Sequence, residues 1–272
     1  MFLYLWMIVQ VLCESLPISS SGHVTLLIAI AEKFHWSLNC MSDVWAFDYL
    51  IQGVSAILFF CYFFSSWWHL IIKKPVIITA LFDYEVWKKN ILPVVIFGIA
   101  ADGITFLFWI CNIAERINFS LLLGFIITAC ALWSIQFAQE KKDINIWSVN
   151  HGLIVGFVQG CALFPGISRF ATTFAALRWI GYRNQDAFPI SFLIQWPLIF
   201  AGSLKGYKAL CQIDMVQSIA TLPFLSLTLI AGLIAYFILC WVQKIIDKNL
   251  LWKFSYYMII PTMLALFMKV IV

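Results

Sequence analysis

Two short stretches of this sequence place polar side chains inside segments that are otherwise apolar. The first reads QVLCESLPISSSGH and spans residues 10–23; the second reads PGISRFATT and spans residues 165–173. Together they supply a carboxylate, hydroxyls, a histidine and an arginine, the groups that a transfer or hydrolysis reaction uses as base, nucleophile and anion ligand. In a chain that is 63% hydrophobic, lipid cannot satisfy such groups, so we expect them to have a function.

The first stretch predicts two helical arms around a polar turn. Gln10 and Glu14 are four residues apart and share one face of a helix that Pro17 ends. A second helix then begins, and the free N–H groups at its start form a ready anion site. The residues at this start are Ser19, Ser20, Ser21 and Gly22. His23 lies one turn beyond Ser20, so Ser20 and His23 are both credible nucleophiles, and His23 is also a candidate base.

The second stretch supplies a cation. Arg169 is expected at membrane depth, which costs roughly 2.5–3.5 kcal/mol by insertion scales and calls for a partner or an anionic ligand. Its planar fork fits phosphate oxygens. The neighbours at this second half-helix start are Gly166, Ser168, Thr172 and Thr173. Both clusters together indicate a phosphate site inside a membrane.

Composition indicates the kind of protein that positions these clusters. Of the 272 residues only 11% are charged, whereas a soluble domain carries about a quarter. We therefore predict a polytopic membrane protein, and the net charge of +4 forms no stripe that would bind nucleic acid. The eight cysteines form no CxxC pair and are predicted to be buried small hydrophobes without disulfides. No basic segment or cleavage site marks a signal peptide.

Six stretches have the roughly 20 mainly apolar residues that a helix needs to cross a bilayer. They are 44–65, 91–111, 118–138, 187–207, 217–242 and 252–272. The regions 2–31 and 148–180 instead contain two short apolar runs around a polar loop, typical of re-entrant hairpins that line a cavity. We predict an all-α polytopic membrane protein with six transmembrane helices and two re-entrant helical hairpins.

Loop charges and an internal echo support this arrangement. If both hairpins return to the side they entered, eleven Lys and Arg residues fall on one side and four on the other, which places both termini outside. Val9-Gln10 and Val158-Gln159 each precede a serine nine residues after the glutamine. The sequence thus predicts a single integral membrane domain, residues 1–272, made of an inverted-topology repeat of about 1–140 and 141–272.

These residues resemble the undecaprenyl-diphosphatase (bacitracin-resistance) family, whose motifs read approximately ExxxEFLPISSSGH and PGxSRSGxT. FDYLIQGVS at 47–55 and SFLIQWP at 191–197 are similar to further segments of the family, so the resemblance covers nearly the whole chain. It implies hydrolysis of undecaprenyl (polyprenyl) diphosphate to the monophosphate and inorganic phosphate. That reaction recycles the lipid carrier of peptidoglycan synthesis at the outer face of the bacterial inner membrane and confers bacitracin resistance.

The motifs and the resemblance together predict a set of site residues. The predicted catalytic residues are Glu14, Ser20, His23 and Arg169. The predicted substrate-binding residues are Gln10, Ser19, Ser21, Gly22, Gly166, Ser168 and Thr173. The resemblance also implies a divalent cation, Mg²⁺ or Ca²⁺, with Glu14 as a ligand, and a homodimer is compatible with it. Two departures stand out: Gln10 replaces a frequent glutamate, and Phe170-Ala171 replace Ser-Gly.

Two questions stay open at this level. Asp102 is a carboxylate within a predicted span and has no assigned role, and Gln52, Gln159 and Gln195 are candidates to line the cavity. An alternative function is a transporter or flippase of an anionic polyprenyl phosphate lipid, because inverted repeats with broken helices also build transporters. The hydroxyl, histidine and carboxylate chemistry favours the enzyme, since a carrier needs no nucleophile.

Overall fold

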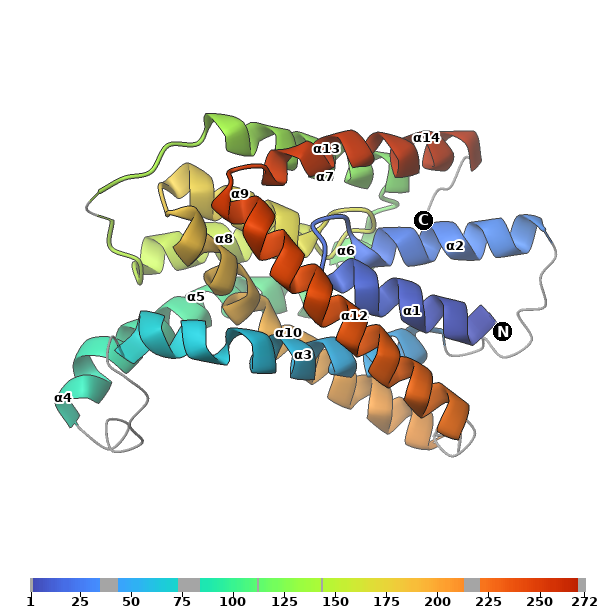
Figure 1. Ribbon diagram of the computed structural model, residues 1–272, viewed down its shortest axis with the longest axis horizontal. Coiled ribbons are helices and arrows are strands. Elements are labelled where there is room, and N and C mark those ends of the chain that lie inside the picture. Colours follow the sequence, from blue (N-terminus) through green and yellow to red (C-terminus); the bar gives the residue numbers. More distant parts are fainter. Residues whose placement is uncertain are drawn as a thin grey trace.

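The computed structural model describes residues 2–34, 44–72, 84–111, 113–142, 144–212 and 221–268, and this part of the chain is built from helices (Figure 1). The longer helices are α1 (Phe2–Glu14), α2 (Ser20–Lys33), α3 (Val44–Ile72), α5 (Leu92–Ile110), α7 (Leu121–Ser134), α8 (Val149–Cys161), α9 (Arg169–Ile180), α10 (Asn184–Gln212), α12 (Leu222–Asp247) and α14 (Ile259–Met268). Shorter helical pieces are α4 (Tyr84–Val86), a π-helix (Trp87–Ile91), α6 (Ile113–Arg116), α13 (Phe254–Tyr257) and the 3₁₀ turns Ile135–Phe137 and Leu251–Lys253.

Five helical segments of the described chain are long and apolar enough to cross a membrane. They are Ala46–Ile72, Trp87–Ile110, Asn184–Gln212, Leu222–Asp247 and Leu251–Met268. The protein is therefore a multi-pass membrane protein, as predicted. The predicted span 118–138 contains a shorter apolar helix, Leu121–Phe137, because α7 begins only after Ser120 and its last turn tightens into a 3₁₀ helix. The predicted span ends at 217 and 272 lie outside the described residues.

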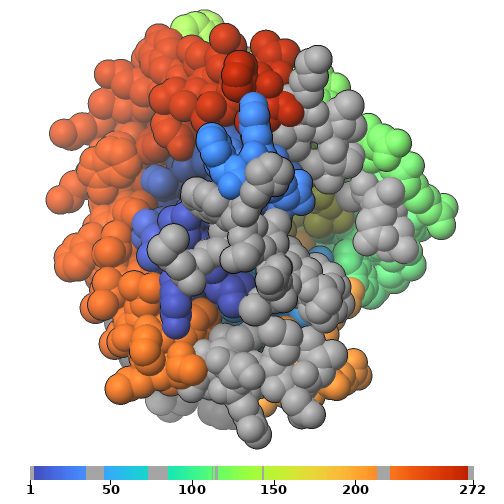
Figure 2. All heavy atoms as spheres, turned by 90° about the vertical axis from the view of Figure 1, so that its right-hand side faces the viewer, coloured from blue at the N-terminus to red at the C-terminus, as the bar shows by residue number. Residues whose placement is uncertain are grey.

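Two helix–loop–helix units carry the polar stretches. The predicted half-helices of 2–31 are α1 and α2, and those of 148–180 are α8 and α9; in each unit the two helices pack on one another. The first unit packs against the C-terminal helices, α1 on α12 and α2 on α14, and Figure 2 shows its blue residues beside the orange and red ones. The second unit packs α8 on α5 and α9 on α7, while α3 and α10 form the most extensive helix pair.

Close contact between the two polar loops depends on glycine. A Cβ on Gly124 of α7 would lie 2.1 Å from a backbone oxygen of the second loop, and one on Gly22 would lie 2.9 Å from the Gly166 Cα atom. Gly166 has a φ of +84°, a conformation that L side chains rarely adopt. Thr128 of α7 fixes the same loop, because its hydroxyl donates to the Gly166 carbonyl at 2.8 Å and accepts from the Ser168 N–H at 2.9 Å. Helix α7 therefore holds both loops together.

The prediction of buried cysteines is wrong for most of those described. Cys13 is buried and Cys161 and Cys240 are half-buried. The exposed thiols are Cys61, Cys111, Cys130 and Cys211. Lipid covers the outer face of a membrane helix, so a small apolar thiol there exposes little that lipid would reject. All seven of these cysteines are free, and Cys40 lies outside the described residues.

We predict that Gly124→Ala lowers stability and Gly103→Ala does not. The methyl group at Gly124 meets backbone atoms that cannot rotate away, and overpacking of this kind costs about 1–3 kcal/mol, whereas a Cβ at Gly103 meets nothing within 4 Å. Thermal unfolding of the purified variants in detergent measures the difference. Equal melting temperatures for the two variants would show that the loops have room to separate.

Candidate active site

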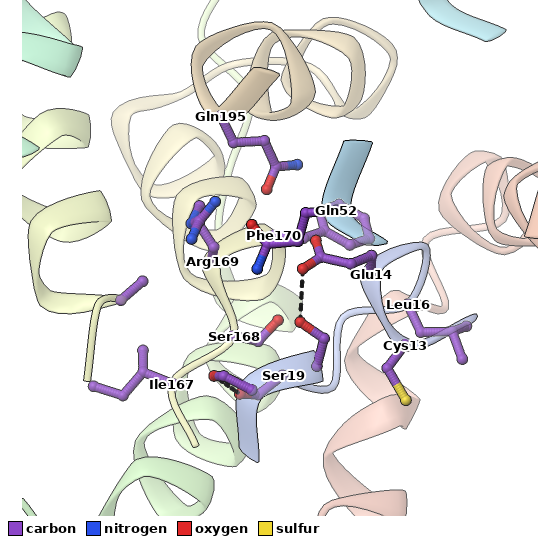
Figure 3. Close-up of a pocket in the computed structure, with 13 residues that line it drawn as sticks. Cys13, Glu14, Leu16, Ser19, Gln52, Ile167, Ser168, Arg169, Phe170 and Gln195 are labelled. Carbon is purple, nitrogen blue, oxygen red and sulfur yellow. Dashed lines mark hydrogen bonds between the residues drawn. The ribbon is translucent and has the colours of Figure 1, made fainter. Parts of the chain in front are cut away.

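The two polar loops enclose a cavity of about 50 Å³ between the helix–loop–helix units (Figure 3). Most of its wall comes from the ends of α1 and α2 and from the second loop with the start of α9, while α3 and α10 each add a glutamine. The lining residues that carry polar side chains are Cys13, Glu14, Ser19, Ser20, Ser21, Gln52, Ser168, Arg169 and Gln195. The cavity is thus the meeting point of both sequence motifs.

Two helix N-termini open onto this cavity. Ser19 is the N-cap of α2, and its hydroxyl accepts a hydrogen bond from the Gly22 N–H at 3.2 Å. Ser168 caps α9 in the same way, with its hydroxyl accepting from the Ala171 N–H at 3.2 Å. Both serines are at the helix starts predicted from sequence. Because the first N–H groups of a helix carry partial positive charge, their convergence favours an anion between them.

A carboxylate and a hydroxyl from the two arms of the first unit meet in the cavity. Ser20 Oγ donates to Glu14 Oε1 at 2.8 Å, and the Gln10 side-chain amide donates to the same oxygen at 3.0 Å. The predicted common face of Gln10 and Glu14 is confirmed by this contact. Figure 3 shows this bond as a dashed line that ends at Glu14. Glu14 is therefore placed to accept the proton of Ser20.

Arg169 brings a cation into the cavity and forms no ion pair with the described part of the chain. The ion pairs formed there are Arg178–Glu140 and Arg183–Asp186, and neither involves Arg169. Its Nε atom is buried and lacks a hydrogen-bond partner among the described residues. The nearby Gln195 is 2% exposed, and its Nε2 atom has no described partner either. Donors left unpaired at membrane depth indicate a site completed by an anionic ligand.

The two hydrogen bonds of the His23 ring in the described chain go to Ser19 and Tyr257, and neither goes to Ser20. The ring Nδ1 atom lies 2.8 Å from the Ser19 carbonyl oxygen and the Nε2 atom lies 3.0 Å from the Tyr257 hydroxyl. A carbonyl only accepts, so Nδ1 carries the proton. Ser19 has a φ of +68°, a left-handed conformation that costs a non-glycine residue about 1–2 kcal/mol, and the contact with His23 helps to hold it. The expected pairing of Ser20 with His23 is thus replaced by a pairing of Ser20 with Glu14.

The remaining predicted residues lie around the cavity and do not line it. Gly22 and Gly166 form the contact between the loops, and Gln10 supports Glu14 from behind. Thr173 is fully buried, and its hydroxyl donates to the Arg169 carbonyl at 2.7 Å. Phe170, part of one of the two departures from the family motif, does line the cavity, and it is buried among aromatic rings that include Phe192 at 4.8 Å. These residues shape the loops and the first turn of α9.

Sequence reasoning missed Asp48, a carboxylate four residues before Gln52 on α3. Its Oδ1 atom accepts from the Trp6 indole N–H at 3.1 Å, and its Oδ2 atom accepts from the Gln52 amide at 3.2 Å. Gln52 lines the cavity, so Asp48 orients one of its walls. The signal was present in the sequence as an ionisable residue within a predicted span, spaced to share a helix face with Gln52.

Asp102 has a structural partner. The Gln159 amide donates to Asp102 Oδ1 at 3.1 Å and also reaches the Thr105 hydroxyl at 3.3 Å. Gln159 is fully buried and does not line the cavity, unlike Gln52 and Gln195. The contact ties α8 to α5 at membrane depth. Asp102 therefore accepts the hydrogen bond of a buried side-chain amide, that of Gln159 in the second unit.

The donor set of the cavity fits a divalent cation only in part. No group of three or more His, Cys, Asp or Glu side chains able to hold a metal ion occurs among the described residues. Both hydrogen bonds to Glu14 fall on Oε1, which leaves Oε2 with lone pairs to offer. Mg²⁺ is commonly held by one or two carboxylates together with substrate phosphates and water. Glu14 fits that kind of site, in which the substrate supplies part of the coordination.

The helices and the cavity define a multi-pass membrane protein whose polar centre combines a hydroxyl–carboxylate pair with anion-binding groups. The family model "Bacitracin resistance protein BacA" matches residues 4–264. The chain belongs to this family. It is 32% identical over 267 residues to an undecaprenyl-diphosphatase of Thermosipho africanus, covering 96% of each chain. It is also 28% identical over 261 residues to one of Borrelia hermsii, with 96% of this chain and 95% of the relative covered.

We predict that Arg169→Lys weakens the binding of a non-hydrolysable prenyl methylenediphosphonate by at least about tenfold. Lysine keeps the charge but loses the planar fork, and a hydrogen bond to a charged group contributes about 1.5–3 kcal/mol, where 1.4 kcal/mol is tenfold. Isothermal titration calorimetry of the protein in detergent measures the affinity. Arg183→Lys is the control, because Arg183 is exposed and pairs with Asp186. Unchanged affinity in Arg169→Lys would show that Arg169 acts through its charge alone and not through its planar fork.

Proposed function

We propose that this chain is an undecaprenyl-diphosphatase, which hydrolyses a polyprenyl diphosphate to the monophosphate and inorganic phosphate. The single observation that carries the chemistry is the Ser20–Glu14 hydrogen bond of 2.8 Å beside Arg169, whose Nε atom has no hydrogen-bond partner in the described chain. A nucleophile with an adjacent base, next to groups that bind an anion, is the arrangement that phosphoryl transfer requires. Family membership and relatives named undecaprenyl-diphosphatase supply the substrate class.

The reaction that fits these positions has two displacement steps. Ser20 Oγ attacks the terminal phosphorus while its proton passes to Glu14, and the anhydride bond breaks to release the polyprenyl monophosphate. Water then attacks the phosphoserine, which frees Ser20 and inorganic phosphate. The guanidinium of Arg169 and the starts of α2 and α9 stabilise the charge that develops on the phosphate oxygens. Direct attack by His23 or by water remains an alternative route that the chemical prediction below separates.

A flippase that only moves an anionic polyprenyl phosphate is the less favoured function. Arg169 and the two helix starts would serve a carrier as well as an enzyme. A carrier, however, gains nothing from a half-buried hydroxyl that donates to a carboxylate. The relatives cover nearly their whole length in the comparison and carry an enzyme's name. Both considerations support hydrolysis.

A divalent cation is part of the proposal. Glu14, through Oε2, is the residue that would hold Mg²⁺ or Ca²⁺ together with phosphate oxygens of the substrate. When bound, the cation would neutralise charge on the diphosphate. Gln10 in place of a second carboxylate lowers the negative charge available, so we expect the cation to bind the protein–substrate complex more tightly than the protein alone.

The proposed membrane topology has six spans, with Leu121–Phe137 as the short third one, and the units α1–α2 and α8–α9 as re-entrant hairpins. The pattern of helix contacts supports an inverted repeat. In this repeat each helix of the first half corresponds to one of the second: α1 to α8, α2 to α9, α3 to α10, α5 to α12 and α7 to α14. The α1–α12 contact then corresponds to the α8–α5 contact, and the α2–α14 contact corresponds to the α9–α7 contact. All of these contacts occur, and α3–α10 maps onto itself. Opposite entry of the two hairpins is part of the proposal, because an odd number of proposed spans separates them.

The loop charges support the proposed location. Eleven basic residues on one side against four on the other support a bacterial inner membrane orientation with both termini outside. The starts of α2 and α9 then meet at mid-depth, and we propose that the cavity serves the outer leaflet. There the enzyme would recycle the lipid carrier of cell-wall synthesis. A homodimer is an oligomeric state to test by mass photometry in detergent.

The chemical proposal predicts a non-additive pair of variants. Ser20→Ala and Glu14→Gln should each lower turnover by about 10²–10⁴-fold, the typical contribution of a positioned base, and the double variant should be little worse because members of one catalytic unit act together. Release of inorganic phosphate from polyprenyl diphosphate by the purified protein in detergent is the assay. Ser226→Ala is the control, because Ser226 is exposed on α12. Multiplicative losses in the double variant would favour an attacking water or His23.

The topology predicts which positions react from which side. On a cysteine-free background, Lys142→Cys and Lys248→Cys should be protected from a membrane-impermeant maleimide in intact cells, and Lys33→Cys and Lys208→Cys should react. All four side chains are exposed, so access depends on the membrane side alone. Labelling after permeabilisation is the control for reactivity. Reaction of Lys142→Cys from outside would overturn the placement of the second hairpin.

A further inference from the structure

His23 lies within the first motif, yet every polar contact of its ring points away from Ser20. Nδ1 donates to the Ser19 carbonyl at 2.8 Å, and Nε2 lies 3.0 Å from the Tyr257 hydroxyl. The neutral ring therefore has its one lone pair facing Tyr257, which donates to it. The Tyr257 ring stacks on the imidazole, with centroids 5.9 Å apart and an interplanar angle of 12°. Phe125, which is fully buried, meets the imidazole edge-on at 5.6 Å.

The contact with Ser19 places His23 one residue away from the proposed nucleophile. The Ser19 carbonyl accepts from both the backbone N–H of His23, at 3.2 Å, and its Nδ1–H. The same residue has the left-handed φ of +68° and caps α2. Ser20 is the first residue of that helix, and its hydroxyl reaches Glu14. The direction of the Ser20 side chain thus depends on the backbone that His23 holds.

We infer that His23 is a positioning residue, and that Tyr257 of α13 is a further positioning residue of the same site that orients the imidazole. This inference rests on the proposed function, in which Ser20 attacks and Glu14 takes the proton. His23 then keeps the left-handed Ser19 in place through Nδ1–H, and the Tyr257 hydroxyl fixes the tautomer that makes this donation. The last span thereby contributes to a site that the two hairpins otherwise build.

Asparagine and glutamine separate positioning from proton transfer at His23. The amide nitrogen of asparagine reaches the place of Nδ1, whereas that of glutamine reaches the place of Nε2. His23→Asn should therefore retain turnover within about tenfold, since it keeps the hydrogen bond to Ser19 and loses one to Tyr257. His23→Gln and His23→Ala should lose about 100-fold, the cost of displacing a reacting group by about 1 Å. KM should change little, because the phosphate ligands stay in place.

The Tyr257 hydroxyl is tested with a matched pair of variants. Tyr257→Phe keeps the stacked ring and should lower kcat about three- to tenfold with an unchanged pH profile, the effect of losing one neutral hydrogen bond. Tyr256→Phe is the control, because Tyr256 packs on Trp133 and Trp252 away from His23. The inference is overturned if His23→Asn is as inactive as His23→Ala in folded protein, or if His23→Asn removes a limb of the pH profile.

A readout independent of activity keeps this inference separate from the proposed function. Hydrogen exchange over residues 18–24 should rise in His23→Ala and His23→Gln and stay near that of the unmodified chain in His23→Asn. Unchanged protection in all three variants would show that His23 does not hold Ser19, and would overturn the inference even if the chain hydrolyses polyprenyl diphosphate. Absence of hydrolysis by the unmodified chain together with the expected exchange pattern would instead refute the proposed function.

Discussion

The structure depends on one constraint. Two polar loops lie inside an apolar helical protein, so their hydrogen-bonding groups must find partners within the protein. Backbone at membrane depth is tolerated only where protein or a wet cavity covers it. Gly22, Gly124 and Gly166 let the loops and α7 approach to distances that a Cβ would prevent. Thr128 then joins the second loop to α7 through both its donor and its acceptor. Among the described residues, the Nε atom of Arg169 stays unpaired in this assembly, and the first N–H groups of two helix starts face the same cavity; a phosphate group pairs with donors of both kinds.

This constraint also explains why the site contains both acid–base and anion-binding groups. Glu14 and Ser20 are on separate arms of one hairpin, and the left-handed turn at Ser19 brings them to 2.8 Å. That turn is costly, and the imidazole of His23 stabilises it from the side that faces the last span. A strained residue beside a reactive hydroxyl is consistent with pre-organisation of the nucleophile, because the geometry needed for attack exists before the substrate binds.

Much of the fold was predictable because its signals are local. Apolar run length gave the multi-pass class, Pro17 and the serines gave the start of α2, and the four-residue spacing gave the contact of Gln10 with Glu14. The rest depends on distant parts of the chain. Nothing in the first motif indicates that Tyr257, 234 residues away, takes the free nitrogen of His23. Likewise, nothing near Trp6 in the sequence indicates its hydrogen bond to Asp48. The exposure of the four exposed cysteines depends on which helix face meets lipid, and this too is set by distant parts of the chain.

The two halves of the proposed repeat differ in the hydrogen bond that the corresponding glutamine donates. In the first, Gln10 donates to Glu14 on its own helix, and this leaves the carboxylate at the cavity beside Ser20. In the second, the equivalent Gln159 donates to Asp102 on α5, and Asp102 does not line the cavity. Both of these carboxylates, Glu14 and Asp102, belong to the first half, whereas Arg169 belongs to the second. Since a guanidinium paired within the protein would bind an anion less well, the two glutamine contacts, which engage both of these carboxylates, favour the proposed phosphate site at Arg169.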